Sequence, residues 1–170
     1  MGTANRIVLL GSQYLELVGV VDPTEAEASP FGRSVLERSR EGDGWLTLAA
    51  SSDDVGAVAA RLGLEVRTGS RVLPDGAEIR WRMAGLDDPR RAAWMPFFIT
   101  WDIPRELHPG AQRAGHGVRA EGLAWVEVGG DASLLLAWLG GEDLPLRVTY
   151  APAGIIAVAV ATPGGELVIC

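Results

Sequence analysis

The chain has 170 residues, of which 48% are hydrophobic and 22% are charged, so it is long enough for one soluble globular domain with a real core. All fifteen basic residues are arginine, which excludes lysine Schiff-base chemistry and a P-loop. The net charge of −7 argues against a nucleic-acid partner, because neutralising phosphates requires a basic surface. We expect a cytoplasmic protein without a membrane span, since the longest apolar run, residues 153–161, is shorter than the roughly 20 residues that a span needs.

The chain begins with a predicted β-hairpin. Residues 6–10 and 14–21 are rich in β-branched and aliphatic side chains and are separated by the turn Gly11-Ser12-Gln13. Residues 23–44 are polar and contain several glycines and prolines. We expect this segment to be a linker with one helical turn, near residues 35–38.

Residues 45–103 form the first complete predicted unit. Val55, Val58, Ala59 and Leu62 follow the helical spacing i, i+3, i+4, i+7, and the flanking segments have the alternation or apolar content of strands. We therefore expect strands at residues 45–50, 64–72, 78–83 and 96–102 and a helix at residues 53–62. The charged run at residues 87–91 is expected to be a solvated loop.

The last third of the chain predicts a second unit of the same kind. After a loop at residues 104–122, strand patterns at residues 123–128, 146–150, 155–161 and 166–169 surround a helical pattern at residues 131–139. At an offset of 77 residues, Leu46 falls on Leu123, Asp54 on Asp131 and Gly63 on Gly140. These matches favour an internal βαβββ duplication within one compact domain.

Several motifs carry a family resemblance. They are Gly2-Thr3-Ala4-Asn5-Arg6, Tyr14-Leu15-Glu16-Leu17, Asp75-Gly76, Arg80-Trp81-Arg82, Pro96-Phe97-Phe98-Ile99 and His108-Pro109. Together they resemble the glyoxalase-like domain proteins of the vicinal oxygen chelate superfamily, which includes glyoxalase I, ring-cleaving dioxygenases and bleomycin-resistance proteins. The resemblance implies an α+β fold, in which βαβββ modules build a curved mixed or antiparallel sheet with helices on its outer face.

One departure from the family concerns the start of the chain. In the family, the Gly-Thr-Ala-Asn stretch follows a strand and a helix, whereas here it follows Met1 directly. We therefore expect residues 1–22 to be a partial first module, either because those elements are lacking or because the natural chain starts further upstream. The open sheet edge would favour pairing with another chain, and hence a homodimer.

The resemblance also implies a divalent metal bound by His and Glu at four positions. Only Glu16 matches; the third position falls on Trp45, and residues 97–100 offer no ligand for the fourth. We therefore expect no metal and no other cofactor, and Glu16 is the candidate catalytic residue. His108 and His116 lie eight residues apart in a loop, which is not a metal-ligand spacing.

Strand alternation predicts a binding surface. If helices cover the set containing Ile79, Trp81, Phe97, Ile99 and Trp101, the opposite set lines the concave face. That set comprises Tyr14, Glu16, Trp45, Thr47, Arg80, Arg82, Phe98, Thr100 and Asp102. Arginine suits the recognition of an acidic or polar small molecule. The alternative is that Arg80, Arg82, Glu16 and Asp102 only pair across neighbouring strands.

Three functions follow as hypotheses. The first is a small-molecule-binding protein of unknown ligand that lacks the usual metal, as an analogue of bleomycin-resistance proteins. The second is a metal-dependent lyase, isomerase or dioxygenase of the same superfamily that uses Glu16. The third is an interaction module that recruits a partner through the edge of the N-terminal hairpin. The scaffold alone does not choose between them, because one fold supports many chemistries.

Overall fold

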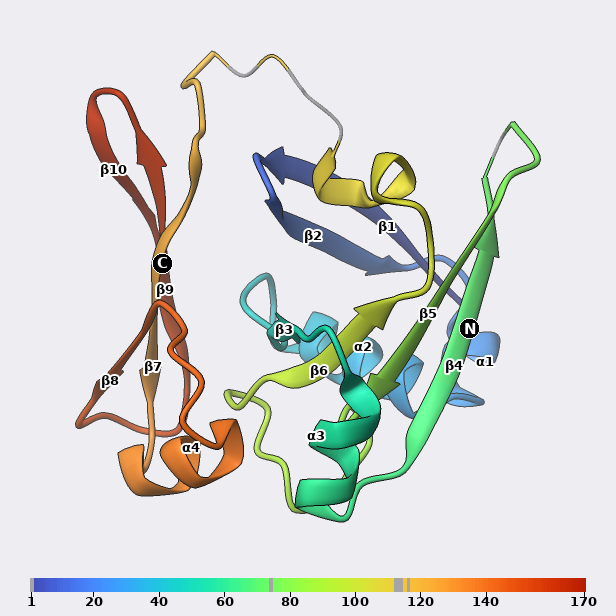
Figure 1. Ribbon diagram of the computed structural model, residues 1–170, viewed down its shortest axis with the longest axis horizontal. Coiled ribbons are helices and arrows are strands. Elements are labelled where there is room, and N and C mark those ends of the chain that lie inside the picture. The colour runs from blue at the N-terminus through green and yellow to red at the C-terminus, as the bar shows by residue number, and fades with distance from the viewer. Residues whose placement is uncertain (1, 74, 112–114, 116) are drawn as a thin grey trace. The chain divides into compact units, whose positions relative to one another are not determined.

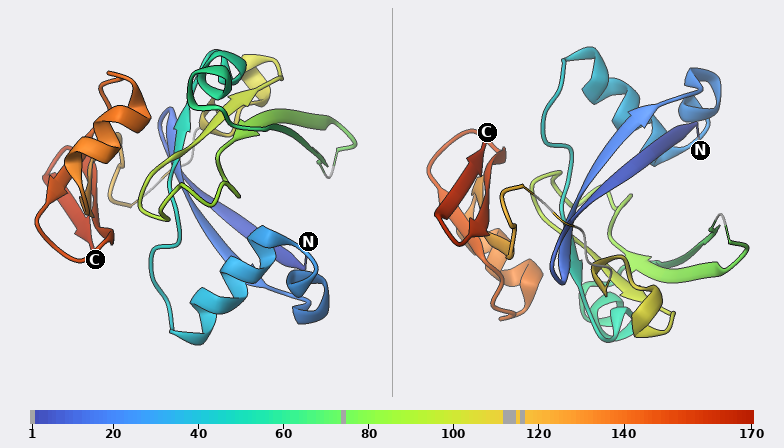
Figure 2. Two further views of the ribbon diagram at one scale, coloured as in Figure 1. Left: turned by 90° about the horizontal axis from the view of Figure 1, so that it is seen from below. Right: turned by 90° about the horizontal axis from the view of Figure 1, so that it is seen from above.

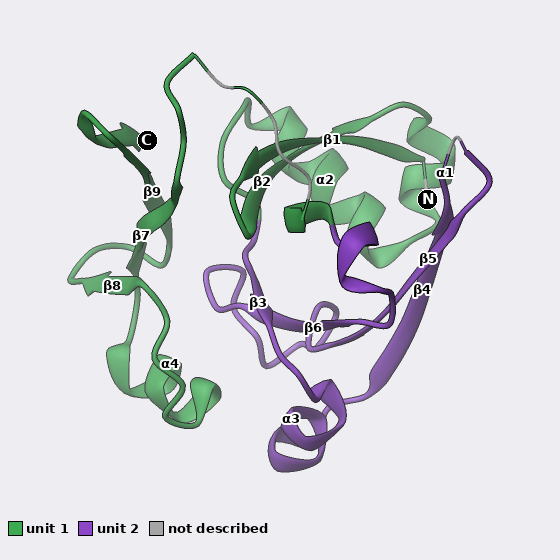
Figure 3. Ribbon diagram, turned by 45° about the horizontal axis from the view of Figure 1, so that its top comes forward, with its two compact units in different colours: residues 1–46, 109–170 green, residues 47–108 purple. Residues whose placement is uncertain are grey.

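The computed structural model describes residues 2–73, 75–111, 115 and 117–170, and the chain divides into two compact units (Figure 3). Unit 1 comprises residues 1–46 and 109–170, and unit 2 comprises residues 47–108. His116, considered above as a ligand, lies outside the described residues. The helices and mixed sheets confirm the α+β class. In this described part of the chain, no helix is long and apolar enough to cross a membrane.

Unit 2 is a single βαβββ module. It contains β3 (Ala49–Ser51), α3 (Val55–Leu62), β4 (Val66–Val72), β5 (Glu78–Ala84) and β6 (Phe97–Trp101), in the predicted order. The strands lie in the order β3-β6-β5-β4; β3 is parallel to β6, and the other pairs are antiparallel (Figure 1). The strand expected at residues 45–50 is shorter, because residues 45–48 are not in a strand.

The helix of unit 2 has clear start and stop signals. The Asp54 carboxylate accepts hydrogen bonds from the backbone N–H groups of Gly56 and Ala57, which would otherwise lack partners in the first turn. Gly63 ends the helix in the left-handed conformation with a φ of 63°. The short helix is thereby fixed at both ends over the sheet.

The N-terminal part of unit 1 is a hairpin followed by two helices. Strands β1 (Thr3–Leu10) and β2 (Gln13–Val20) pair antiparallel around Gly11 and Ser12, which confirms the predicted hairpin. Helices α1 (Pro23–Glu27) and α2 (Pro30–Arg40) occupy the segment that we expected to be a linker, and α2 packs against β2 (Figure 2). The linker assignment is wrong: the turn expected at residues 35–38 lies within α2, which is longer, and α1 precedes it.

The C-terminal part of unit 1 holds a second four-stranded sheet. Its elements are β7 (Gly122–Gly129), α4 (Ala132–Leu139), β8 (Leu146–Thr149), β9 (Gly154–Thr162) and β10 (Gly165–Ile169). The strand order is β10-β9-β7-β8, and β7 is parallel to β8. The first strand of this sheet is therefore central, whereas the first strand of unit 2 is at an edge. The predicted repetition applies to the order of elements along the chain but not to the arrangement of the strands.

Two short 3-10 helices, η1 (Arg105–Leu107) and η2 (Pro109–Ala111), lie between β6 and β7. Within unit 1, the tip of the hairpin is attached to the start of β7, because the Gln13 side-chain oxygen accepts a hydrogen bond of 2.7 Å from the backbone N–H of Leu123. This bond joins segments that are 110 residues apart in the sequence.

Candidate functional site

The sheet of unit 2 has one face that is covered by its helix. In the register, Ala84 lies opposite Phe98 and Arg82 opposite Thr100, so these four side chains share a face. The backbone N–H of Val55, at the start of α3, donates a hydrogen bond of 3.0 Å to the Thr100 hydroxyl. We call this surface the helix face.

This arrangement reverses the predicted assignment of the two faces. We expected helices to cover Phe97, Ile99 and Trp101, but α3 covers the face that carries Phe98 and Thr100. Phe98 is 3% exposed and Thr100 is 8% exposed, so neither is available to a ligand on an open concave surface. The polar Thr100 is accommodated because its hydroxyl also donates to the Ser52 carbonyl, at 2.6 Å.

Arg80 and Arg82, at the uncovered end of the helix face, hold carboxylates. Both Nε and Nη2 of Arg82 donate to Asp102, at 2.7 and 2.8 Å, and both Nε and Nη2 of Arg80 donate to one oxygen of Glu78, at 3.0 and 2.6 Å. These hydrogen bonds lower the pKa values of Asp102 and Glu78. Arg82–Asp102 is the cross-strand pair that the alternative interpretation expected, and a ligand-binding role for these arginines stays a prediction that their pairing does not favour.

The remaining predicted site residues are distributed over both units. Tyr14 and Glu16 lie two residues apart on β2 of unit 1; Glu16 is exposed and accepts a hydrogen bond from the Asn5 side chain on β1. Trp45, in unit 1, follows α2 outside any strand, and its carbonyl accepts a hydrogen bond from an arginine of α2. Thr47, in unit 2, accepts a hydrogen bond of 3.0 Å from Nη1 of Arg91.

The residues that the structure describes do not fit a glyoxalase-type metal centre. Such a centre needs several His or carboxylate ligands on one ion, yet no group of three or more His, Cys, Asp or Glu side chains that could hold a metal is found among residues 2–73, 75–111, 115 and 117–170. The hydrogen-bond partner of Glu16 is the amide of Asn5, a weak ligand compared with a carboxylate or an imidazole.

The second face of the unit 2 sheet is aromatic. The rings of Trp81 on β5 and Trp101 on β6 lie opposite each other, with centroids 5.4 Å apart and a tilt of 55°. The His108 ring meets Trp101 edge-on at 5.5 Å, and burial lowers the pKa of this imidazole. We call this surface the tryptophan face; its residues on β4, β5 and β6 are Arg67, Gly69, Arg71, Ile79, Trp81, Met83, Phe97, Ile99 and Trp101.

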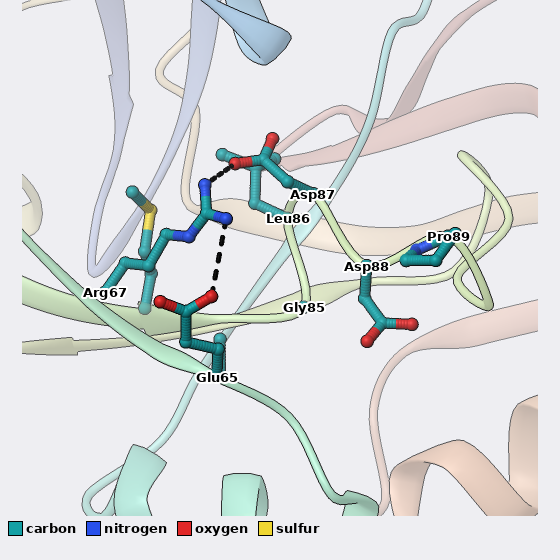
Figure 4. Close-up of a pocket in the computed structure, with 9 residues that line it drawn as sticks. Glu65, Arg67, Gly85, Leu86, Asp87, Asp88 and Pro89 are labelled. Carbon is teal, nitrogen blue, oxygen red and sulfur yellow. Dashed lines mark hydrogen bonds and ion pairs between the residues drawn. The ribbon is translucent and has the colours of Figure 1, made fainter.

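A small cavity adjoins this face (Figure 4). Its volume is about 230 Å³, and it is lined by Glu65, Arg67, Met83, Ala84, Gly85, Leu86, Asp87, Asp88 and Pro89. Arg67 and Met83 belong both to the cavity and to the tryptophan face. The Arg67 guanidinium lies between two carboxylates: Nη1 is 2.5 Å from Asp87, and Nη2 is 3.5 Å from Glu65.

The loop that forms one wall of the cavity is organised around Arg91. Its guanidinium donates hydrogen bonds to the carbonyls of Gly85, Leu86 and Met95, at 2.8, 3.0 and 2.6 Å. Burial lowers the pKa of Arg91, although the charges of Asp87 and Asp88 oppose that effect. We expected residues 87–91 to be a solvated loop; Arg91 is instead partly buried, and no sequence signal distinguishes it from Arg90.

Comparison with known proteins agrees with the fold. A family model described as a glyoxalase-like domain matches residues 1–140, which is well over half of the chain. A comparison with curated proteins finds no match. The family is consistent with the vicinal oxygen chelate superfamily, and it supports a role in small-molecule binding or in enzymatic conversion of a small molecule. The chain belongs to the glyoxalase-like domain family.

Proposed function

We propose that the protein binds a small planar organic acid on the tryptophan face of unit 2. The observation that carries the proposal is the pair of partly exposed indoles, Trp81 and Trp101, on the side of the sheet opposite α3. Aromatic side chains provide large, rigid apolar contact areas and favour flat ligands through stacking. Ligand sites in general combine such apolar walls with a few placed polar groups.

The local packing supports a preformed surface. Gly69 lies directly opposite Trp81, and any side chain at that position would overlap the indole. The ring therefore lies close to the backbone of β4, with Trp101 on its other neighbour β6. A surface that is ordered before binding loses little conformational entropy when a ligand arrives.

The charge of this face supports an acidic ligand. The strand residues that share the face with Trp81 are Arg67, Gly69 and Arg71 on β4, Ile79 and Met83 on β5, and Phe97, Ile99 and Trp101 on β6. All of them are described, and none is acidic, whereas the helix face carries both Glu78 and Asp102. A carboxylate ligand on the tryptophan face would therefore meet arginine, and the two carboxylates that contact Arg67, those of Glu65 and Asp87, lie outside the strands.

Ligand binding in this proposal needs neither a metal nor another cofactor. The ligand is the acidic small molecule that the sequence suggested, but it binds to the tryptophan face and not to the face that carries Arg80 and Arg82. We also keep, as parts of the proposal, a cytoplasmic location and a homodimer. Light scattering coupled to size-exclusion chromatography would report the mass of the assembly.

A titration with two matched probes tests the proposal. Naphthalene-2-carboxylate and the uncharged naphthalene-2-carboxamide are titrated by calorimetry into chelator-treated protein. We expect saturable binding of the acid, weakened about 3- to 10-fold by Trp81→Leu, since one aromatic contact is worth roughly 0.5–1.5 kcal/mol. The helix-face variant Arg80→Gln should bind like the wild type.

Two results would contradict the proposal. One is the absence of saturable binding for both probes. The other is a loss of affinity in Arg80→Gln together with unchanged affinity in Trp81→Leu, which would return the site to the helix face. Circular dichroism of each variant establishes that it has folded, and Trp101→Phe serves as a milder second variant on the tryptophan face.

A further inference from the structure

Among the described ion pairs of unit 2, those of Arg67, Arg80, Arg82 and Arg90 each join an arginine to a carboxylate, and Arg67 differs from the other three. Arg82, Arg90 and Arg80 each use Nε and Nη2 together on a single carboxylate. Arg67 instead divides its two Nη atoms between two carboxylates, at 2.5 Å from Asp87 and 3.5 Å from Glu65. A forked pair, in which two N–H groups bind one carboxylate, is the strongest arrangement for an arginine. Arg67 lacks such a partner in the described structure, because its two Nη atoms contact different carboxylates.

The position of Arg67 is also distinctive. It lies on the tryptophan face two residues before Gly69, and it lines the cavity of about 230 Å³ (Figure 4). Arg80 and Arg82 lie on the opposite face of the same sheet. Arg67 is thus an ion-paired arginine on the same face as Trp81, two strand positions from the residue that lies opposite the ring.

The two members of the Arg67–Asp87 pair differ in their freedom to move. Asp87 follows two residues whose carbonyls, those of Gly85 and Leu86, accept hydrogen bonds from Arg91. Its side chain is 18% exposed, whereas that of Arg67 is 47% exposed. The carboxylate is therefore held by an ordered loop, and the arginine is the member with a long, solvent-accessible stem.

We propose that Asp87 is a built-in competitor that occupies the carboxylate-binding position of Arg67 when no ligand is bound. The inference rests on the proposed function. A ligand acid would take the guanidinium as a forked partner, and the Arg67 side chain would turn away from Asp87, whose carboxylate stays on its ordered loop. The exchange is inexpensive, because partly exposed ion pairs contribute only about 0–1 kcal/mol.

The consequence is a selective effect on acids. Removing the charge of Asp87 should strengthen the binding of an acidic ligand and leave the binding of its neutral counterpart unchanged. The expected gain is about 2- to 5-fold, which corresponds to the modest strength of the pair that no longer has to be broken.

The experiment measures the affinity ratio of naphthalene-2-carboxylate to naphthalene-2-carboxamide in matched variants. Asp87→Asn should raise the ratio about 2- to 5-fold. Asp102→Asn makes the same substitution in the forked Arg82–Asp102 pair on the helix face, and it should leave the ratio unchanged. Arg67→Gln should lower the ratio without abolishing it, because Arg71 on the same face keeps its charge. Asp87→Ser is a second variant in case the asparagine disturbs the loop.

The outcomes separate this inference from the proposed function. If neither probe binds to the wild type, or if Trp81→Leu weakens neither, the proposed function is wrong and this inference is lost with it. If Trp81→Leu weakens both probes while Asp87→Asn and Asp87→Ser lower the ratio or leave it unchanged, the tryptophan face binds ligands and the built-in competitor is wrong. A ratio raised equally by Asp102→Asn would also overturn it, because the effect would then be one of net charge.

Discussion

The indole of Trp81 lies against the backbone of Gly69, its direct partner on the neighbouring strand. A β-carbon at residue 69 would overlap ring atoms of Trp81. The indole therefore occupies the space that a side chain at residue 69 would need. This pair brings the Trp81 ring down onto the sheet, where it also meets Trp101. The aromatic surface of unit 2 thus depends on the absence of a side chain at Gly69.

Gly69→Ala should destabilise the protein and displace Trp81. Adding a methyl group to a filled site forces the indole away, at a cost of about 1–3 kcal/mol of unfolding free energy. Urea denaturation measures that cost. The near-ultraviolet circular dichroism should also change, because the relative orientation of the Trp81 and Trp101 rings would differ.

Gly19→Ala is the matched control. Gly19 also lies within a strand, β2, but a β-carbon there would meet nothing within 4 Å. We expect a change within about 1 kcal/mol and an unaltered near-ultraviolet spectrum. Equal destabilisation by the two variants would show that the effect at residue 69 comes from glycine replacement in a strand and not from overlap with Trp81.

Thr100→Val should weaken the attachment of α3 to the sheet. The substitution preserves shape but removes the acceptor for the Val55 N–H and the donor to the Ser52 carbonyl. Leaving a buried polar group without a partner costs about 1–3 kcal/mol, which denaturation would register.

Thr68→Val is the control for Thr100→Val, because it makes the same substitution at an exposed threonine. Thr68 shares the helix face but is exposed on β4, so its replacement should change stability by no more than about 0.5 kcal/mol. A Thr100→Val protein as stable as the wild type would contradict the role assigned to the buried hydroxyl.

Local signals were enough to predict most elements. The hairpin around Gly11 and the helix ending at Gly63 were predicted because turn glycines and side-chain periodicity are properties of short segments. Helix α1 and most of α2 were missed, although Asp22-Pro23 and Ser29-Pro30 each place a capping residue before a first-turn proline. Residues 23–44 are also polar and rich in glycine, a composition that is typical of a linker and that led to the wrong prediction.

The features of the site that sequence could not supply are non-local. Alternation divides the residues of β6 into two sets, but only the hydrogen bond from Val55 to Thr100 shows which set the helix covers. Likewise, nothing in the segment of β7 indicates that β8 docks beside it and makes it central. Both features depend on contacts between distant segments, and local propensity carries no information about them.

Arg91→Met should be strongly destabilising. The substitution approximately preserves the stem but leaves the carbonyls of Gly85, Leu86 and Met95 without their shared donor. We expect a loss of at least about 2 kcal/mol of unfolding free energy, measured by urea denaturation. Arg80→Met, at an exposed ion pair, should cost no more than about 1 kcal/mol. Equal losses in the two variants would show that the Arg91 guanidinium does not organise the loop between β5 and β6.

The stability of the protein should fall on mild acidification because of His108. Burial lowers the pKa of this imidazole in the folded protein. At a pH between the folded pKa and the ordinary pKa of about 6.5, His108 is therefore protonated in the unfolded chain but neutral in the folded protein. The contribution of the neutral ring is therefore fully present above about pH 6.5 and is lost as the pH falls through the lower folded pKa. His108→Phe preserves an aromatic ring beside Trp101 and cannot titrate. Unfolding free energies measured from pH 7.5 to pH 5 should decline less steeply in this variant, and parallel profiles would assign the acid sensitivity to other groups.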